Sequence, residues 1–199
     1  MAFGDFTLKL AQERFALTTD ERTDLFGAIQ PVGVPDRLRE TLDWWSPLAL
    51  AMNTEKARSE MIIAPILMEA VRLLGDRANL FSGVAFDVDE DRGLNGTCDF
   101  LLSRSPERYF VSHPVLAVVE AKKEDIVGGL GQCASAMVAA QIFNEREGTP
   151  RPAVFGAVTT GNIWRFLTLG GTALSIDAAE YYSGDVGKIL GILQAIAGG

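Results

Sequence analysis

A run of apolar residues that ends abruptly in alternating charges is the feature that most constrains this chain. Residues 115–119 read VLAVV and lead directly into Glu120, Ala121 and Lys122. Side chains alternate between the two faces of a β-strand, so Glu120 and Lys122 point to one face and Ala121 to the other. A carboxylate and an ammonium on a hydrophobic strand are costly to bury unless they are paired or used. The run therefore predicts a core strand that ends in a candidate functional site.

A second acid, Asp99, occupies a comparable position one predicted strand earlier. It follows a strand-like run and precedes the apolar residues 100–102. Two acids and a lysine, at strand positions that apolar residues usually occupy, indicate a metal site. Two simpler interpretations stay open: Asp99 is an ordinary strand-end acid, and Glu120 and Lys122 form an edge-strand salt bridge.

A magnesium ion fits this residue set. Mg²⁺ prefers oxygen ligands and usually takes only one or two carboxylates, with water and phosphate oxygens in its other positions. Asp99 and Glu120 on neighbouring strands would supply such ligands to Mg²⁺ or Mn²⁺. Lys122, on the same face as Glu120, would lie beside a bound water or a scissile phosphate. There it would orient the nucleophile and help to deprotonate it, or stabilise the developing negative charge.

The N-terminal part of the chain, residues 1–52, carries no functional motif and reads as helical. Thr18 and Glu21 have the spacing of a capping box, which predicts a short helix over residues 19–28. A second helix begins at Pro35, and Pro47 is expected to end it.

From residue 53 onward, apolar periodicity predicts a helix, three strands, a helix, and a final group of strands closed by a helix. Asn53 or Thr54 caps the first helix, and Pro65 is expected to kink it. The predicted strands cover residues 81–88, 94–103, 114–121, 153–160, 163–169 and 173–176. The later helices run from the glycines at 128–131 to about residue 145 and over residues 185–197. This order predicts an α/β (α+β) fold with a three-layer core, in which helices flank a central mixed sheet.

The flanking helices add two candidate residues. Glu60 precedes Ile63 by three positions, so it falls on the core-facing stripe of its helix and can aim into a site built on the sheet. The alternative is a carboxylate that reaches water or pairs with Arg58 or Lys56. At the start of the next long helix, Gln132 is either a site residue or a surface residue.

Three segments, taken in order, resemble the PD-(D/E)XK nuclease superfamily: GTCDFLL, AVVEAKK and GLGQ. In that pattern an acid ends one core strand and E-x-K lies on the next, here 21 residues further on. By this resemblance Asp99, Glu120 and Lys122 match the core signature. Glu60 matches the acid of the preceding helix, and Gln132 matches the glutamine of the following helix.

The resemblance covers roughly residues 53–169 and implies a restriction-endonuclease-like core. A single domain over residues 1–199 would then end in a strand and helix at residues 170–199. The segment NTEKARSEMIIAPILMEA also resembles a bacterial, particularly cyanobacterial, branch of the superfamily. Cys98 stands where the proline of the motif's name would be, at a position that supplies no ligand. The implied activity is Mg²⁺-dependent hydrolysis of DNA or RNA, and the implied metal ligands are Asp99, Glu120 and Glu60.

The net charge of the chain is −8 at pH 7, which disfavours unspecific binding to nucleic acid. Nucleic acid, with DNA favoured over RNA, is therefore expected from the resemblance alone. The alternative function is a non-catalytic binding or assembly module that keeps the nuclease-like fold. Trp44 and Trp45 favour core or dimer packing over a binding platform, which is compatible with a homodimer.

The remaining composition favours a cytoplasmic protein without a membrane partner. No apolar run reaches the roughly 18 residues of a membrane span, and the N-terminus lacks the pattern of a secretory signal. Cys98 and Cys133 form neither a disulfide framework nor a CxxC zinc pattern. His113 is the only histidine, which argues against zinc sites and serine triads.

Overall fold

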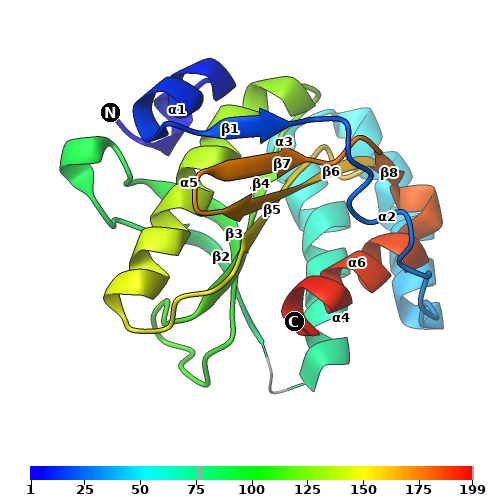
Figure 1. The fold of residues 1–199 in the computed structure, drawn as a ribbon. Coiled ribbons are helices and arrows are strands. Elements are labelled where there is room, and N and C mark those ends of the chain that lie inside the picture. The colour runs from blue at the N-terminus through cyan, green and yellow to red at the C-terminus, as the bar shows by residue number, and fades with distance from the viewer. Residues whose placement is uncertain (76–77, 199) are drawn as a thin grey trace.

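The computed structural model describes residues 1–75 and 78–198, and it has a mixed β-sheet between two layers of helices (Figure 1). The sheet strands in this part of the chain are β1 (Thr18–Asp20), β2 (Asn79–Ala85), β3 (Thr97–Ser103), β4 (Val115–Ala121), β5 (Val154–Thr159), β6 (Ile163–Gly170), β7 (Ala173–Ile176) and β8 (Tyr181–Tyr182). The α-helices are α1 (Leu8–Phe15), α2 (Asp36–Met52), α3 (Glu55–Arg58), α4 (Ala64–Leu74), α5 (Ile126–Arg146) and α6 (Val186–Gly198). The predicted three-layer α/β fold is therefore confirmed.

The sheet order is β1-β7-β6-β5-β4-β3-β2, and β8 pairs with β6 at the side of this path. β4 pairs in parallel with β5, and β1 with β7, whereas the other neighbours are antiparallel. The β4–β5 crossover runs through α5, as a parallel connection requires. β3 and β4, which carry the predicted site residues, thus lie in the interior of the sheet.

Two apolar cores lie on opposite faces of this sheet. The consecutive residues Val118 and Val119 belong to different cores, as the alternation of a strand requires. Val118 packs on the face covered by α1 and α5, together with Met137. Val119 packs on the face covered by α2, α4 and α6, together with Ile66. Burial on both faces explains why β4 is a continuous apolar run.

The helix predicted over residues 19–28 is wrong. Residues Thr18–Asp20 instead form β1, which pairs in parallel with β7. A turn follows β1 in place of the helix, because the Asp20 carboxylate accepts hydrogen bonds from the backbone of Arg22 and the hydroxyl of Thr23. The adjoining segment is fixed to the sheet, since Leu25 N–H donates to Asp177 at 3.1 Å.

Both prolines expected to shape the helical layer behave differently from the prediction. Pro47 lies inside α2, which continues to Met52 and ends at Asn53 in the left-handed conformation. The helix after the Thr54 cap does form, but its irregular part is a π-helical turn over Ser59–Ile63 that precedes Pro65. A π-turn adds a residue to the helical repeat and so shifts the side chains around the axis.

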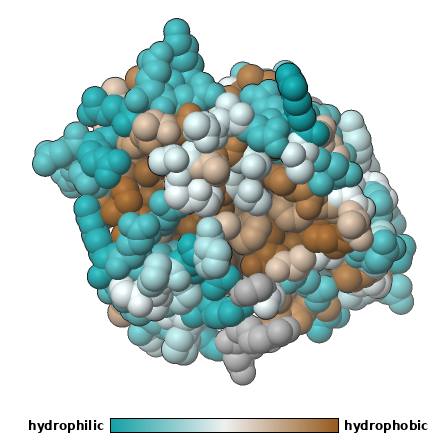
Figure 2. Space-filling model, viewed as in Figure 1, coloured by the Kyte–Doolittle hydropathy of each residue, from teal (hydrophilic) through white to brown (hydrophobic). Residues whose placement is uncertain are grey.

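The longest helix, α5, is apolar enough by length and composition to cross a membrane, but 67% of its most apolar window is buried inside the fold. It covers β4 and β5 as a core helix. On the face seen in Figure 2, hydrophilic residues dominate the upper and left parts, and apolar residues gather toward the middle and right, where α6 lies in Figure 1.

Candidate metal centre

The two predicted acids meet where β3 and β4 stop pairing. The antiparallel register pairs Phe100 with Val119. Asp99 and Glu120 are the next residues outward on the two strands and therefore lie across from each other. The backbone N–H of Ala121 donates a hydrogen bond of 2.8 Å to Asp99 Oδ2, which ties this carboxylate to β4.

Glu120 is a buried acid, with only 3% of its surface exposed. Burial, which disfavours the charged form, raises its pKa to about 8, and the negative charge of Asp99 adds to the rise. The hydrogen bond and positive charge of Lys122 act in the opposite direction but do not cancel the rise. If both acids were ionised, the site would hold two negative charges against one lysine, and a bound metal cation would relieve that imbalance.

Lys122 is held between two acceptors. Its Nζ donates to Glu120 Oε1 at 2.7 Å and to Gln132 Oε1 at 3.1 Å. Burial alone would lower the pKa of Lys122, but the hydrogen bond and charge of Glu120, with smaller contributions from Glu55 and Asp99, raise it overall. The ammonium is therefore protonated at neutral pH. Gln132, which the sequence left open, lies in the site.

The glycines that start α5 allow this helix to approach Lys122. A Cβ atom at Gly129 would lie 2.6 Å from Val158 Cγ1 and 3.1 Å from Lys122 Cγ. Any side chain at this position would therefore displace β5 or the lysine. The helix is capped by Asp125, whose carboxylate accepts a hydrogen bond from Gly128 N–H at 2.8 Å.

A cleft of about 150 Å³ opens beside Asp99. Its floor comes from β2, β3 and β4, and its other wall comes from the start of α3 and the π-helical turn. The lining residues are Glu55, Lys56, Ser59, Ser82, Gly83, Asp99 and Ala121. The helix before the sheet therefore does bring an acid to the site, but the acid is Glu55.

Glu60 does not line this cleft. Its carboxylate is exposed and forms an ion pair of 3.0 Å with Lys56, one of the alternatives that the sequence left open. Ser59 lines the cleft, and the neighbouring Glu60 points away around the helix toward a separate groove. The structure therefore places Glu60 outside the cleft beside Asp99, and its role as a metal ligand stays a prediction of the motif resemblance.

Glu55 is the site residue that sequence reasoning missed. Thr54 caps α3 by accepting a hydrogen bond from Ala57 N–H, so Glu55 is the first residue of the helix. Glu55 and Ser59 are four residues apart, and this spacing places both on one helical face. The Thr54 cap and the four-residue spacing could have predicted this position of Glu55 from the sequence. The apolar stripe that indicated Glu60 instead belongs to the helix after the π-turn.

A buried arginine fixes the helical wall to the sheet. Arg58, 8% exposed, donates to the carbonyl of Thr160 at 2.9 Å and to Asn53 Oδ1 at 3.1 Å. Asn53 in turn donates to Glu124 Oε1 at 2.9 Å. This network joins the start of α3 to the ends of β4 and β5, and so sets the position of Glu55 relative to the strands.

The donor set fits a cation bound mainly by water and substrate. Among residues 1–75 and 78–198, no group of three or more His, Cys, Asp or Glu side chains is arranged to hold a metal ion. Asp99 and Glu120 are nevertheless paired, and two carboxylates are what Mg²⁺ commonly takes from a protein. The observation that supports a cation here is geometric: the two facing acids share a single lysine, Lys122.

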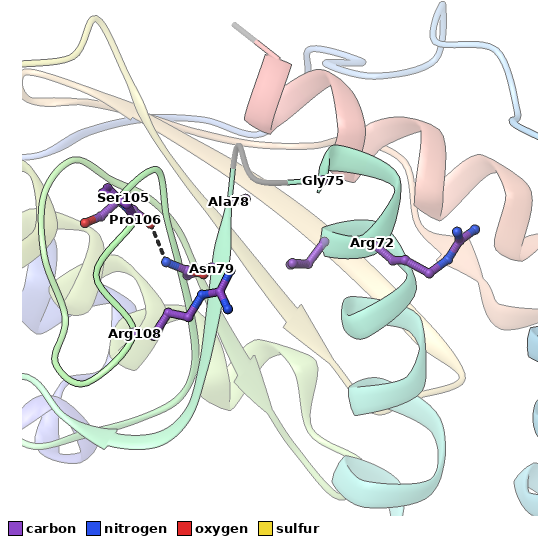
Figure 3. Close-up of a pocket in the computed structure, with 8 residues that line it drawn as sticks. Arg72, Gly75, Ala78, Asn79, Ser105, Pro106 and Arg108 are labelled. Carbon is purple, nitrogen blue, oxygen red and sulfur yellow. Dashed lines mark hydrogen bonds between the residues drawn. The ribbon is translucent and has the colours of Figure 1, made fainter.

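A larger cavity, of about 620 Å³, lies elsewhere in the described part of the chain. Figure 3 shows its lining, in which Arg72 extends from α4 and Arg108 from the loop after β3. Asn79 bridges the cavity wall by donating to Ser105 and Glu107 carbonyls. Asn79 pairs with Ser103 at the other end of β3 from Asp99, so this cavity is separate from the acid pair.

Searches among protein families, curated proteins and solved structures found no match.

Proposed function

We propose that this protein is a metal-dependent phosphodiesterase of the PD-(D/E)XK type that hydrolyses nucleic acid, with DNA favoured over RNA. One observation carries the proposal: the buried Glu120 faces Asp99 at the end of β3 and β4, with Lys122 hydrogen-bonded beside it. Two facing acids, one of them buried, cannot both be ionised without cost in a fold that uses them only for packing. A cation bound to both carboxylates would remove that cost.

Asp99 and Glu120 would hold Mg²⁺ or Mn²⁺, and Glu55 is a further acid in the same cleft. When bound, the ion supplies Lewis-acid chemistry, which lowers the pKa of water and polarises a phosphoryl oxygen. The hydrogen bond from Ala121 N–H to Asp99 Oδ2 would hold this carboxylate in one orientation. The other carboxylate oxygen, Oδ1, would then serve as the metal ligand. The exposed Glu60 has no part in this set.

Lys122 acts as a charged donor. Its raised pKa keeps the ammonium protonated, which favours stabilisation of negative charge over removal of a proton from water. The hydrogen bonds to Glu120 and Gln132 use two of its three N–H donors, and the third serves a water or a phosphate oxygen. Gln132 is then a positioning residue that holds the ammonium at the strand end.

The direct test incubates plasmid, single-stranded DNA and RNA with the protein and Mg²⁺ or Mn²⁺. Wild-type protein is expected to cleave at least one DNA substrate, and Lys122→Ala to lose most of that activity. The matched control is Lys123→Ala, because Lys123 is the next lysine and is exposed. Equal cleavage by wild type and Lys122→Ala would indicate a contaminant and contradict the proposal.

A non-catalytic module with the same fold is the second candidate. It is favoured by the net charge of −8 and by the engagement of Lys122 with Glu120. Calorimetric titration with Mn²⁺ separates the two candidates. Binding that Asp99→Asn abolishes supports the metal centre, and absence of binding at millimolar Mn²⁺ supports the module.

A cytoplasmic location belongs to the same proposal. Cys98 and Cys133 are both buried free thiols, which suits a reducing compartment.

A further inference from the structure

A second surface on the helical side of the molecule has no function in the proposed chemistry. We infer that the exposed stripe of α2 is the interface through which two copies of this chain associate. The stripe consists of Trp44, Trp45, Leu48 and Met52, all exposed. Trp44, Leu48 and Met52 are spaced by four residues and therefore lie along one side of the helix. The adjoining side of α2 is buried through Leu38, Leu42 and Ala49, so the stripe lies along the edge of the buried face.

The exposure of the tryptophans is what separates this stripe from the core. Trp44 is 74% exposed and Trp45 41% exposed, so the expectation of core packing for this pair is wrong. An isolated exposed apolar residue is ordinary, but four on one helical side, two of them tryptophan, are not. Tryptophan is also the residue most enriched at the centre of protein interfaces. The remaining alternatives are an interface between proteins and a stacking surface for bases.

A groove beside the stripe supplies a complementary shape. Two shallow cavities of about 250 and 270 Å³ share Thr41 and Pro65 and therefore form one depression between α2 and α4. Trp45 and Met61 line one part, and the exposed Met68 lines the other. A protruding Trp44 and an adjacent depression on the same surface are what a two-fold interface needs, because each copy must present both parts.

The apolar area matches that of a dimer interface. An aromatic side chain offers about 150–250 Å², so the exposed parts of Trp44 and Trp45 amount to roughly 200–300 Å². Leu48, Met52 and Met68 bring the total to on the order of 400 Å². A standard interface buries about 800 Å² per partner, of which somewhat more than half, about 450 Å², is apolar. The stripe is therefore large enough for the apolar centre of a dimer.

The charges at the rim favour a second copy over nucleic acid. At one end of the groove Arg37 and Arg72 form ion pairs with Glu69, and at the other end Lys56 pairs with Glu60. Glu40 and Asp43 add exposed acids on α2 itself. This mixed rim lacks the clustered positive charge that phosphate binding needs. It also allows two acidic chains to meet there without strong repulsion.

The test is the oligomeric state of the full chain. By sedimentation equilibrium the wild type should dimerise with a dissociation constant of about 10 µM or below, since interfaces of this size span micromolar to picomolar affinity. Trp44→Glu combined with Leu48→Glu should be monomeric throughout. Val127→Glu should dimerise like the wild type, because Val127 is an equally exposed apolar residue on α5, across the sheet.

Circular dichroism checks that each variant folds, which is expected because the substituted side chains are exposed. A wild type that stays monomeric at about 200 µM would overturn the inference, since a weaker interface than this has no use at ordinary protein concentrations. A dimer that survives the Trp44 and Leu48 substitutions would overturn it as well. A monomer that binds single-stranded DNA through Trp44 would reassign the stripe to base stacking. None of these outcomes depends on the metal centre.

Discussion

Two buried glutamates in this fold have opposite surroundings. Glu69 on α4 is 5% exposed and accepts hydrogen bonds from two arginines, Arg37 at 2.5 Å and Arg72 at 2.7 Å. Glu120 is 3% exposed but has one lysine and faces another acid. The hydrogen bond from Arg72 outweighs burial and lowers the pKa of Glu69, whereas burial and Asp99 raise that of Glu120 to about 8. A buried acid whose charge is matched by cationic partners, such as Glu69, holds helices together. A buried acid with fewer cations than nearby acids, such as Glu120, indicates a binding site.

Removing the carboxylate of Glu120 and that of Glu69 in separate variants should give the largest difference between the two sites. Glu120→Gln should abolish metal-dependent cleavage, by more than about 10³-fold, because it removes a ligand to the ion. Glu69→Gln should leave cleavage unchanged but destabilise the fold by about 1–3 kcal/mol, since two arginines lose their acceptor. Cleavage rates and urea unfolding measure the two effects. Full cleavage activity in Glu120→Gln would contradict the assignment of Glu120, and not Glu69, to the metal centre.

The lysine beside Glu120 is expected to matter for rate more than for binding. Lys122→Met should lower kcat about 10²-fold, the effect of losing one donor to the transition state. Mn²⁺ binding should persist, because both carboxylates remain. Single-turnover cleavage and Mn²⁺ calorimetry check this, with Lys123→Met as the exposed control. Loss of Mn²⁺ binding together with rate would show that Lys122 only maintains the fold of the site.

The two glutamates should also give stability opposite dependences on pH. The pKa of Glu120 is raised from 4.5 to about 8, so its stabilising contribution is complete below pH 4.5 and is lost as the pH rises through 8. The full loss should be about 5 kcal/mol, at about 1.4 kcal/mol for each pKa unit, and Glu120→Gln should remove it. The pKa of Glu69 is lowered, so its contribution is present above its unfolded pKa and is lost in acid.

Chemical unfolding of the metal-free protein between about pH 2 and pH 9, compared between wild type and each variant, measures these two slopes. Because other groups titrate in both proteins, the difference between wild type and variant is the informative quantity. An identical pH profile for wild type and Glu120→Gln would contradict the raised pKa of Glu120.

The smallest predicted effect on cleavage distinguishes Glu55, which lines the cleft, from Glu60, which does not. Glu55→Gln should reduce metal-dependent cleavage about 10-fold, as expected for a residue that supports a metal site without being its principal ligand. Glu60→Gln should leave activity unchanged and alter stability by less than about 0.5 kcal/mol, because its partner Lys56 is exposed. The reverse result would show that Glu60 is the acid that turns toward the strands when substrate binds.

Most of the site was predictable because its residues obey the local period of a strand. Glu120 and Lys122 alternate with Ala121, and Asp99 ends the neighbouring strand. Gln132 was matched through the motif resemblance alone, and the residues themselves left its role open. These residues lie where two-residue alternation and short loops place them, so no long-range information was needed. The three-layer fold followed in the same way from the order of strands and helices.

The rest depended on contacts between distant parts of the chain. β1 is three residues long and forms through pairing with β7, which lies more than 150 residues later. Without knowledge of the pairing with β7, the polar residues of β1 fit a helix cap as well as they fit a strand. Glu55 replaced Glu60 because a π-turn changes the helical phase by a step that apolar periodicity does not reveal. Pro47 remains within α2, where neighbouring contacts outweigh its local cost.

Titration of the metal-free protein with Mn²⁺ by calorimetry at pH 7, in two buffers of different ionisation enthalpy, tests the central claim most directly. The unbalanced acid pair predicts saturable binding at one site with release of close to one proton, because Glu120 with a pKa of about 8 is mostly protonated beforehand. Glu120→Gln should abolish both signals, and Glu69→Gln should retain both. Absence of binding in the wild type, or unchanged binding in Glu120→Gln, would contradict the metal centre.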